Sequence, residues 1–528
     1  MKITLRDKED RRKEIPIREN QTVLEALQKA DIYIPALCAG RGTCGKCKIR
    51  ILEGQVTETR FDTDQEQGRL ACKTCALTDI VVELEKGDEQ EIAVEGVKAS
   101  AKSHSAYGEH YFIAIDIGTT TIAMALVEEE SGEIRTTHAA LNRQRMHGAD
   151  VISRIAAANN GHLEELHRLI TEDLWQGIGL LTENGRIPIS KVVIAANTTM
   201  VHLLMGYSCE SLGRHPFFSE HLGLLNTTLG EIMADITVAQ KDKSAIDGYD
   251  ETEAESRLGV PLVVLPGISA FVGSDITADL LICPGFREEG VSLLLDMGTN
   301  GEMVIGNGNR LIASSTAAGP AFEGGNITCG IGSIPGAINQ VKIMNRRAVI
   351  GTIGGKQPAT GICGTGIIAG MAELKRNRLM NPEGTLQPPY DKTGYPLWSS
   401  PRGEKIAIYQ QDIRQLQLAK GAIRAGMEQL MEAYGCKPNE VDRVYLAGGF
   451  GTKLPIQEAI EIGLFPKEFT GKIIAIGNGA LQGAIAYGRK EEALTGNKQL
   501  KDILKRVEGL NLALAEGFEE RYLKYLDF

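Results

Sequence analysis

Alternating hydrophobic and polar positions run through most of the first 90 residues. The segments KITLRD, KEIPI, CKIRILEG and DIVVELE alternate or carry β-branched residues, so each is predicted to be a short strand. Between the second and third, TVLEALQKA has helical spacing, with Thr22 as its N-cap and Glu25 at the capping-box position. The order strand, strand, helix, Cys-rich loop, strand, strand predicts a small β-grasp domain over residues 1–90.

The pattern changes twice further along the chain. Residues 91–110 carry small, polar and charged residues without a period, which predicts a linker; a surface strand with a loop is the alternative. From Tyr111 the segment YFIAIDIGTTTIAMALVE reads as strand, Gly/Thr turn and strand, and VSLLLDMGTNGEMVIG repeats this unit 180 residues later. We therefore predict two similar lobes, residues 111–290 and 291–528, which can exchange terminal elements.

Composition narrows the class of protein. Glycine makes up 60 of 528 residues, about 11% against a usual ~7%, while proline numbers only 18, so many tight turns are expected. The net charge of −11 argues against a nucleic-acid binder, which usually carries a basic face. We find no secretory signal and no apolar stretch long enough for a bilayer, which predicts a cytoplasmic protein that does not enter a membrane.

Four cysteines form a spaced set, Cys38-x5-Cys44-x2-Cys47 followed later by Cys72. A 2Fe–2S cluster needs four thiolates, and the glycines of AGRGTCGKC let the backbone wrap around it. The spacing resembles plant-type and adrenodoxin-type ferredoxins, in which the last ligand follows a Leu-Ala or Leu-Gly pair, as Cys72 does here. Two alternatives stay open: zinc bound by the two CxxC pairs, and Cys75 in place of Cys72.

The two DxGT turns suit phosphate binding. Glycine brings the backbone close, and threonines offer N–H and hydroxyl donors, while Asp116 at a strand end suits Mg²⁺ held through water. Together with LAGGFG at 446–451, the turns resemble the actin, sugar kinase and Hsp70 superfamily, which binds ATP·Mg between two ribonuclease-H-like lobes. The resemblance implies that Asp116 and Asp296 flank the metal and phosphates, and that the following residues bind the nucleotide: Gly118, Thr119, Thr120, Thr121, Gly298, Thr299, Asn300, Gly448, Gly449 and Phe450.

A ferredoxin module fused to this ATPase fold resembles the ATP-dependent reductive activators of corrinoid proteins. GADVISR, PGISAFVGSDITAD, AGPAFEGGNITCG and IGNGALQGA match that family as well. The resemblance implies an enzyme that returns Co(II) to Co(I) in a corrinoid protein of a methyltransferase system. The reduction potential of a plant-type cluster is about −400 mV, and reduction to Co(I) needs a very low potential. The resemblance therefore implies that ATP shifts the balance between conformations, while an external low-potential donor supplies the electron. A homodimer is left open.

Several points stay undecided by the sequence. Asp275, Glu302 and Glu323 all lie near the motif turns as candidates for the hydrolysis base, and we place Glu302 with Asp116 and Asp296 in the catalytic set. The helix DIRQLQLAKGAIRAG is predicted to face the core, with Lys420 reaching a phosphate as the alternative. Other functions that fit are an ATP-driven donor to another low-potential metalloenzyme, a redox-sensing small-molecule kinase and an ATP-holding binding module.

Overall fold

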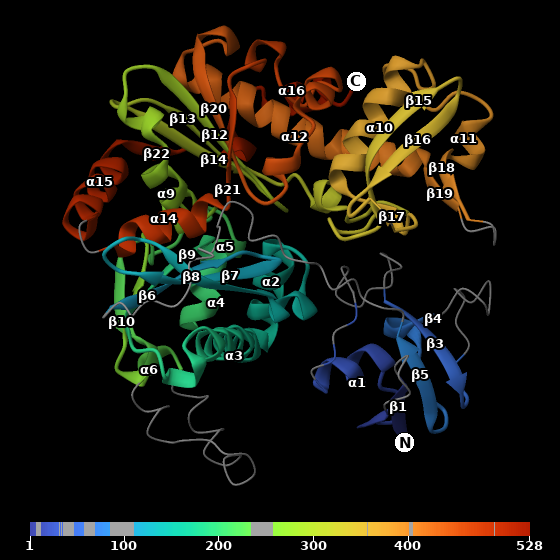
Figure 1. The fold of residues 1–528 in the computed structure, drawn as a ribbon. Coiled ribbons are helices and arrows are strands. Elements are labelled where there is room, and N and C mark those ends of the chain that lie inside the picture. Colours follow the sequence, from blue (N-terminus) through green and yellow to red (C-terminus); the bar gives the residue numbers. More distant parts are fainter. Residues whose placement is uncertain are drawn as a thin grey trace.

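The computed structural model describes residues 1–6, 12–30, 32, 34, 47–57, 69–84, 110–233, 257–355, 357–400, 405–489 and 492–528. The predicted ligands Cys38 and Cys44, and the predicted linker up to residue 109, lie outside these residues. Figure 1 shows a small N-terminal sheet and two larger sheets with helices around and between them.

The N-terminal unit is a five-stranded sheet in the order β2-β1-β5-β3-β4, with β1 and β5 parallel. The capping box predicted for its helix is present, since the Glu25 amide donates to Thr22 Oγ1 and the Thr22 amide donates to Glu25 Oε2. This is the expected β-grasp arrangement. Its elements are β1 (Lys2–Arg6), β2 (Arg12–Pro16), α1 (Val23–Lys29), β3 (Lys48–Glu53), β4 (Arg69–Leu70) and β5 (Ile80–Leu84).

The two larger sheets share one topology. In each, three strands form an antiparallel meander, a fourth strand pairs parallel with the first, and a fifth pairs parallel with the fourth. The repeated DxGT unit thus opens two equivalent sheets, as expected for ribonuclease-H-like lobes. The first sheet has the order β10-β11-β9-β6-β7-β8, from β6 (Tyr111–Ile117), β7 (Thr121–Glu128), β8 (Ile134–Leu141), β9 (Ile189–Ala196), β10 (Leu225–Thr228) and β11 (Pro261–Val264). The second has the order β21-β20-β12-β13-β14-β22, from β12 (Val291–Met297), β13 (Gly301–Gly306), β14 (Leu311–Thr316), β20 (Val441–Ala447), β21 (Ile473–Gly477) and β22 (Val507–Gly509).

Helices cover both sheets. The first lobe carries α2 (Val151–Ala157), α3 (Leu163–Leu181), α4 (Thr198–Met205), α5 (Glu210–Gly213), α6 (Leu229–Ile232) and α9 (Ser274–Ile282). The second carries α10 (Gly364–Arg376), α11 (Tyr390–Thr393), α12 (Gln410–Tyr434), α13 (Ile456–Glu461), α14 (Gly479–Gly488), α15 (Glu492–Arg506) and α16 (Phe518–Lys524). Two small sheets add β15 (Ala337–Met344), β16 (Arg347–Thr352), β17 (Gly361–Ile362), β18 (Tyr395–Ser399) and β19 (Lys405–Ile408).

A pair of helices, α9 and α14, lies between the two large sheets (Figure 1). One buried core joins Phe112 of β6, Ile276 of α9, Leu481 of α14 and Leu294 of β12. Helix α14 comes from the C-terminal part of the chain, yet it packs on β6 and β9 of the first sheet. The lobes therefore share elements at their junction, and the helix pair connects one sheet to the other.

The α9–α14 contact depends on glycine. A Cβ atom built on Gly483 would lie 2.1 Å from the Ala278 carbonyl oxygen and 2.7 Å from its Cα, and both are backbone atoms that cannot rotate away. We expect Gly483→Ala to lower the free energy of unfolding by about 2 kcal/mol through overpacking. Gly223→Ala is the matched control, because its Cβ would meet no atom within 4 Å. Denaturant titration of both variants checks this, and equal stabilities would contradict it.

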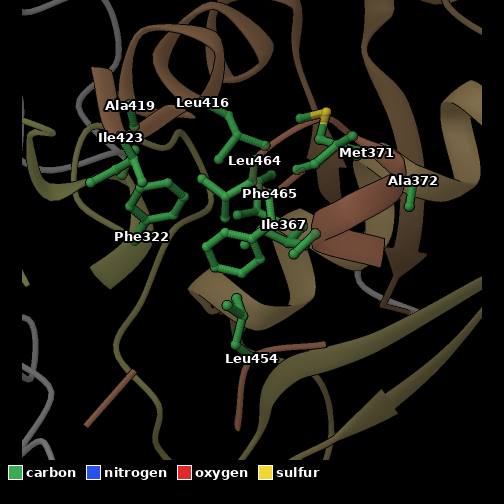
Figure 2. Close-up of a cluster of buried hydrophobic side chains, with 14 of the residues drawn as sticks. Phe322, Ile367, Met371, Ala372, Leu416, Ala419, Ile423, Leu454, Leu464 and Phe465 are labelled. Carbon is green, nitrogen blue, oxygen red and sulfur yellow. The ribbon is translucent and has the colours of Figure 1, made fainter. Parts of the chain in front are cut away.

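The core of the second lobe holds the AGPAFEGG segment. Figure 2 shows Phe322 of this segment beside Ile423 and Ala419 of α12, with Ile367 of α10 in the same cluster. Helix α12 faces this core as predicted. The alternative that Lys420 reaches a phosphate finds no support, because its buried ammonium donates to the carbonyl oxygens of Tyr525 and Asp527 at 2.7 and 2.6 Å.

Candidate functional site

The two DxGT turns are each closed by a backbone hydrogen bond from the glycine, and the first turn is one residue longer than the second. Asp116 lies next to the end of β6, and the Gly118 amide donates to the Thr121 carbonyl at 2.8 Å. In the repeat, Asp296 holds the same place in β12, and the Gly298 amide donates to the Asn300 carbonyl at 3.0 Å. Each turn thus reverses the chain directly after an aspartate at a strand end.

A cluster of carboxyl groups lies where the two lobes meet, with Asp279 and Glu302 buried and the other members half-buried. Asp116, Asp275, Asp279, Asp296 and Glu302 repel one another electrostatically, and burial raises their pKa values. The pKa reaches about 7 for Asp116 and Asp296 and about 6 for Asp275, and it lies well above the ordinary range for Asp279 and Glu302. So many acids close together suit a site that binds a cation.

Asp279 is the member of this cluster that the sequence analysis missed. It is fully buried, and both its carboxylate oxygens lack a hydrogen-bond partner among the described residues. A buried carboxylate without a partner is costly, so this group points to a ligand that supplies one. The signal was present in GSDITAD, because Asp275 and Asp279 are four residues apart and lie on one face of α9.

Asn478 was missed as well. Its side chain caps α14 by accepting from the Leu481 amide at 2.8 Å, and its Nδ2 donates to Asp116 Oδ2, also at 2.8 Å. The next residue, Gly479, lies so close to Asp279 that an added Cβ would be 2.1 Å from Oδ1. The N-terminus of α14 therefore fixes two carboxylates of the cluster, although it lies 362 residues from Asp116 in the chain.

Two acids of the second lobe lie in or beside the cluster. Glu302 on β13 pairs with Asp296 across the strands, and Ser315 Oγ lies 3.5 Å from its Oε1. Glu323 accepts a hydrogen bond from Thr299 Oγ1 at 3.1 Å. Arg145 of the first lobe lowers the pKa of Glu323, although burial raises that pKa overall. Side chains of both lobes thus act on the same region.

The LAGGFG segment begins beside Asp296. Ala447 of β20 pairs with Asp296, and Gly448 follows with φ +87°, a left-handed conformation that favours glycine. A Cβ on Gly448 would also lie 2.8 Å from Asp296 Oδ1, whereas Gly449 has open space around its Cβ position. The Phe450 ring lies 5.5 Å from the ring of Phe322. The structure therefore brings LAGGFG to the carboxyl cluster.

A buried arginine supports the first turn. Arg154 is 0% exposed; one guanidinium nitrogen donates to the Thr119 carbonyl and Nε donates to the Gly148 carbonyl at 3.0 Å. Asn142 adds a bond from its Nδ2 to the Gly118 carbonyl at 3.0 Å. The segment 148–154 matched a family pattern in the sequence, and the structure gives it, together with Asn142, a role in holding this turn.

Two of the four proposed cluster ligands are described, and they lie together. The sulfur atoms of Cys47 and Cys72 are 3.3 Å apart, and both residues are at most 5% exposed. Cys75 instead sits in a β-bridge with Thr22, and its amide donates to Thr57 Oγ1 at 3.0 Å. This geometry supports Cys72 over Cys75 as the partner of Cys47 at one iron.

The raised pKa values make stability depend on pH. Between the ordinary value of 3.8 and about 7, the folded chain holds protons on Asp116 and Asp296 that the unfolded chain releases. The metal-free protein should therefore lose stability as the pH rises through this window. Asp116→Asn should flatten that dependence, measured as melting temperature against pH, and a slope equal to that of the unchanged protein would contradict it.

Comparisons with known protein families divide the chain into an N-terminal, a middle and a C-terminal part. The family model described as "2Fe-2S iron-sulfur cluster binding domain" matches residues 7–77. Those described as "RACo middle region" and "C-terminal domain of RACo the ASKHA domain" match residues 111–246 and 290–528. No helix of the described part of the chain is long and apolar enough to cross a membrane.

Similar proteins are known over most of the length. The corrinoid activation enzyme RamQ of Eubacterium limosum is 33% identical over 425 residues, which is 76% of this chain and 67% of RamQ. The Co(II) methylated amine-specific corrinoid protein reductase of Methanosarcina barkeri is 24% identical over 79% of this chain and 77% of its own. A solved structure, "Reductive activator for corrinoid,iron-sulfur protein", is 27% identical, with a TM-score of 0.67 over 100% of this chain and 98% of that one.

Proposed function

The chain belongs to the family of reductive activators of corrinoid proteins, and from this premise we propose that it reduces the Co(II) form of a corrinoid protein to Co(I) in an ATP-dependent reaction. The proposal rests on one observation. A 2Fe–2S domain and an ASKHA domain with a carboxyl cluster occur in the same chain. The partner is a corrinoid protein of a methyltransferase system, and the reaction takes place in the cytoplasm.

The ferredoxin domain would supply the electron path. We propose that Cys38, Cys44, Cys47 and Cys72 hold the cluster, which accepts one electron from an external low-potential donor and passes it on. The 3.3 Å distance between Cys47 and Cys72 sulfurs supports these two thiolates as ligands of the same iron. Their burial in the β-grasp core would keep water from that side of the cluster.

The carboxyl cluster would hold Mg²⁺ with the nucleotide phosphates. The donors fit this ion, since Mg²⁺ prefers carboxylate oxygens and Asp279 keeps two oxygens without a partner among the described residues. Asp116 and Asp296 flank the metal in this proposal. The turn residues Gly118, Thr119, Thr120, Thr121, Gly298, Thr299 and Asn300 would bind the phosphates, and Gly448, Gly449 and Phe450 the adenosine.

Glu302 is our candidate for the base that activates water. Burial and the neighbouring carboxylates Asp275 and Asp296 raise its pKa well above the ordinary range, so it readily takes a proton.

The helix pair between the sheets offers the route from ATP to the partner surface. Asp275 and Asp279 lie on α9 and Asn478 caps α14, so both helices reach the carboxyl cluster, and both also pack between the two lobes. A ligand shifts a conformational balance only by binding its two states differently. We propose that the nucleotide favours one arrangement of the lobes, and that this arrangement binds the Co(I) form better.

One experiment tests the function directly. The full chain, purified without oxygen, is mixed with a reduced low-potential donor and a Co(II) corrinoid protein, and the Co(I) absorption band is followed with and without Mg·ATP. The proposal expects Co(I) to accumulate only with ATP and expects the corrinoid protein to stimulate ATP hydrolysis. Absence of both, with an intact cluster spectrum, would overturn it. ATP-dependent reduction of another metalloenzyme, or phosphate transfer to a small molecule, would then identify one of the alternatives.

A further inference from the structure

Two histidines and a glutamate converge on the surface of the first lobe, away from the carboxyl cluster. Glu165 Oε2 lies 3.4 Å from His147 Nε2 and 3.3 Å from His162 Nδ1. The ligand atoms of the three residues all lie within 4.8 Å of one another. The nucleotide and electron-transfer steps proposed above use none of these side chains.

An irregular backbone brings them together. His147 ends the 3-10 turn Arg143–His147, while Glu165 lies in the first turn of α3. His162 is presented by the π-helical segment Ala158–His162, where Gly161 has φ +93° and the chain kinks between two helices. Asn160, with φ −97° and ψ 20°, also departs from helical geometry, so the segment is a kink between two helices. The kink turns His162 toward a glutamate only three residues later.

The distances match a metal tetrahedron. Ligands bound about 2.05 Å from zinc at tetrahedral angles are separated by about 3.3 Å. The two measured separations from Glu165 Oε2 are 3.3 and 3.4 Å. The octahedral edge for a harder ion at a similar bond length would be shorter, about 2.9 Å. The third separation, between the ligand nitrogens of His147 and His162, is within 4.8 Å.

Imidazole also suits a borderline cation, because a neutral ring keeps a lone pair on one nitrogen for the metal. A bare ion pair between Glu165 and protonated histidines is the competing explanation for this cluster. That explanation does not require Zn²⁺ to bind.

We propose that His147, His162 and Glu165 form a binding site for Zn²⁺ or a similar borderline divalent cation, with a fourth position left to water. The cation joins the segment 143–147 to the start of α3. Because Asn142, at the start of that segment, holds the Gly118 carbonyl of the first phosphate turn, the bound ion braces the support of that turn. The site is independent of the corrinoid reaction and is tested without it.

The test uses untagged, cluster-loaded full chain and Zn²⁺ alone. Competition with a chromophoric chelator gives the affinity, and X-ray absorption at the zinc edge gives the ligand atoms. We expect one equivalent of zinc with nitrogen and oxygen ligands and no sulfur. His147→Gln and His162→Gln should each weaken binding by about tenfold or more, as should Glu165→Gln, whereas the neighbouring exposed Glu164→Gln should leave it unchanged.

Three results would overturn the site. They are the absence of stoichiometric zinc in the unchanged protein, sulfur ligands that place the metal among the cysteines, and equal affinity in His147→Gln and the unchanged chain. The absorption measurement on the unchanged protein does not depend on how the variants fold, so misfolding of a variant cannot conceal the answer.

Discussion

Cys72→Ala should abolish the 2Fe–2S absorption spectrum and lower ATP-dependent formation of Co(I) by at least about 100-fold, because a cluster of this type requires four thiolates. Cys72 is 5% exposed and its sulfur lies 3.3 Å from that of Cys47, so no water ligand can take its place without rearranging the core. Binding of Mg·ATP should be unchanged, since the nucleotide residues belong to other sheets. Optical spectroscopy, nucleotide titration and the Co(I) assay measure these three quantities.

Cys75→Ala is the matched control for this substitution. Cys75 is three residues away and differs in its surroundings: it forms a β-bridge with Thr22, and its backbone amide donates a hydrogen bond to Thr57 Oγ1. The control should retain both the spectrum and Co(I) formation. If Cys75→Ala lost the cluster and Cys72→Ala kept it, the fourth ligand would be Cys75.

Asp116→Asn should lower the rate of ATP hydrolysis by about 100-fold or more while the chain stays folded. The amide has the shape of the carboxylate and can still accept the hydrogen bond from Asn478 Nδ2, so the turn keeps its geometry. What is lost is the negative charge beside the proposed Mg²⁺ position, and removal of one group that stabilises developing charge typically costs 10²–10³ in rate. The cluster spectrum should not change.

Asp442→Asn is the matched control, because it makes the same change of charge on another β-strand. Asp442 lies on β20 with an exposed side chain, in the sheet that also contains Asp296. Steady-state hydrolysis at saturating Mg·ATP compares the two variants. Full activity in Asp116→Asn would remove Asp116 from the catalytic set, and a loss of similar size in Asp442→Asn would show that the assay reports general damage.

The fold was predictable because its main signals are local or repeated. The β-grasp order follows from short alternating segments and one capping box, and both are present in the structure. The two lobes follow from the DxGT unit that occurs twice. What one sequence could not show is that α14, near the C-terminus, packs on β6 and β9, since such a contact depends on long-range packing and leaves no local signature.

Some residues of the candidate site could also be predicted from the sequence, and others could not. Asp116 and Asp296 could be chosen because each lies near the end of a strand, two residues before a glycine. Asn478 could not, because its partner is 362 residues away and an asparagine before a glycine usually means a turn. For Lys420 the sequence favoured the core and left phosphate binding as the alternative, and in the structure its ammonium donates to the carbonyl oxygens of Tyr525 and Asp527 near the C-terminus.

The repeated sheet gives the molecule an internal pseudo-symmetry that its proposed ligand lacks. The two ends of a nucleotide differ chemically, so two copies of one turn that face it contact different groups. The sequences of the two turns are therefore not selected for the same contacts. Thr121 opens β7, whereas its counterpart Gly301 opens β13, where a Cβ would lie 2.1 Å from Ile423 Cδ1 of α12. Divergence after duplication is therefore expected to concentrate after the shared Asp-x-Gly-Thr, where a symmetric scaffold adapts to an asymmetric molecule.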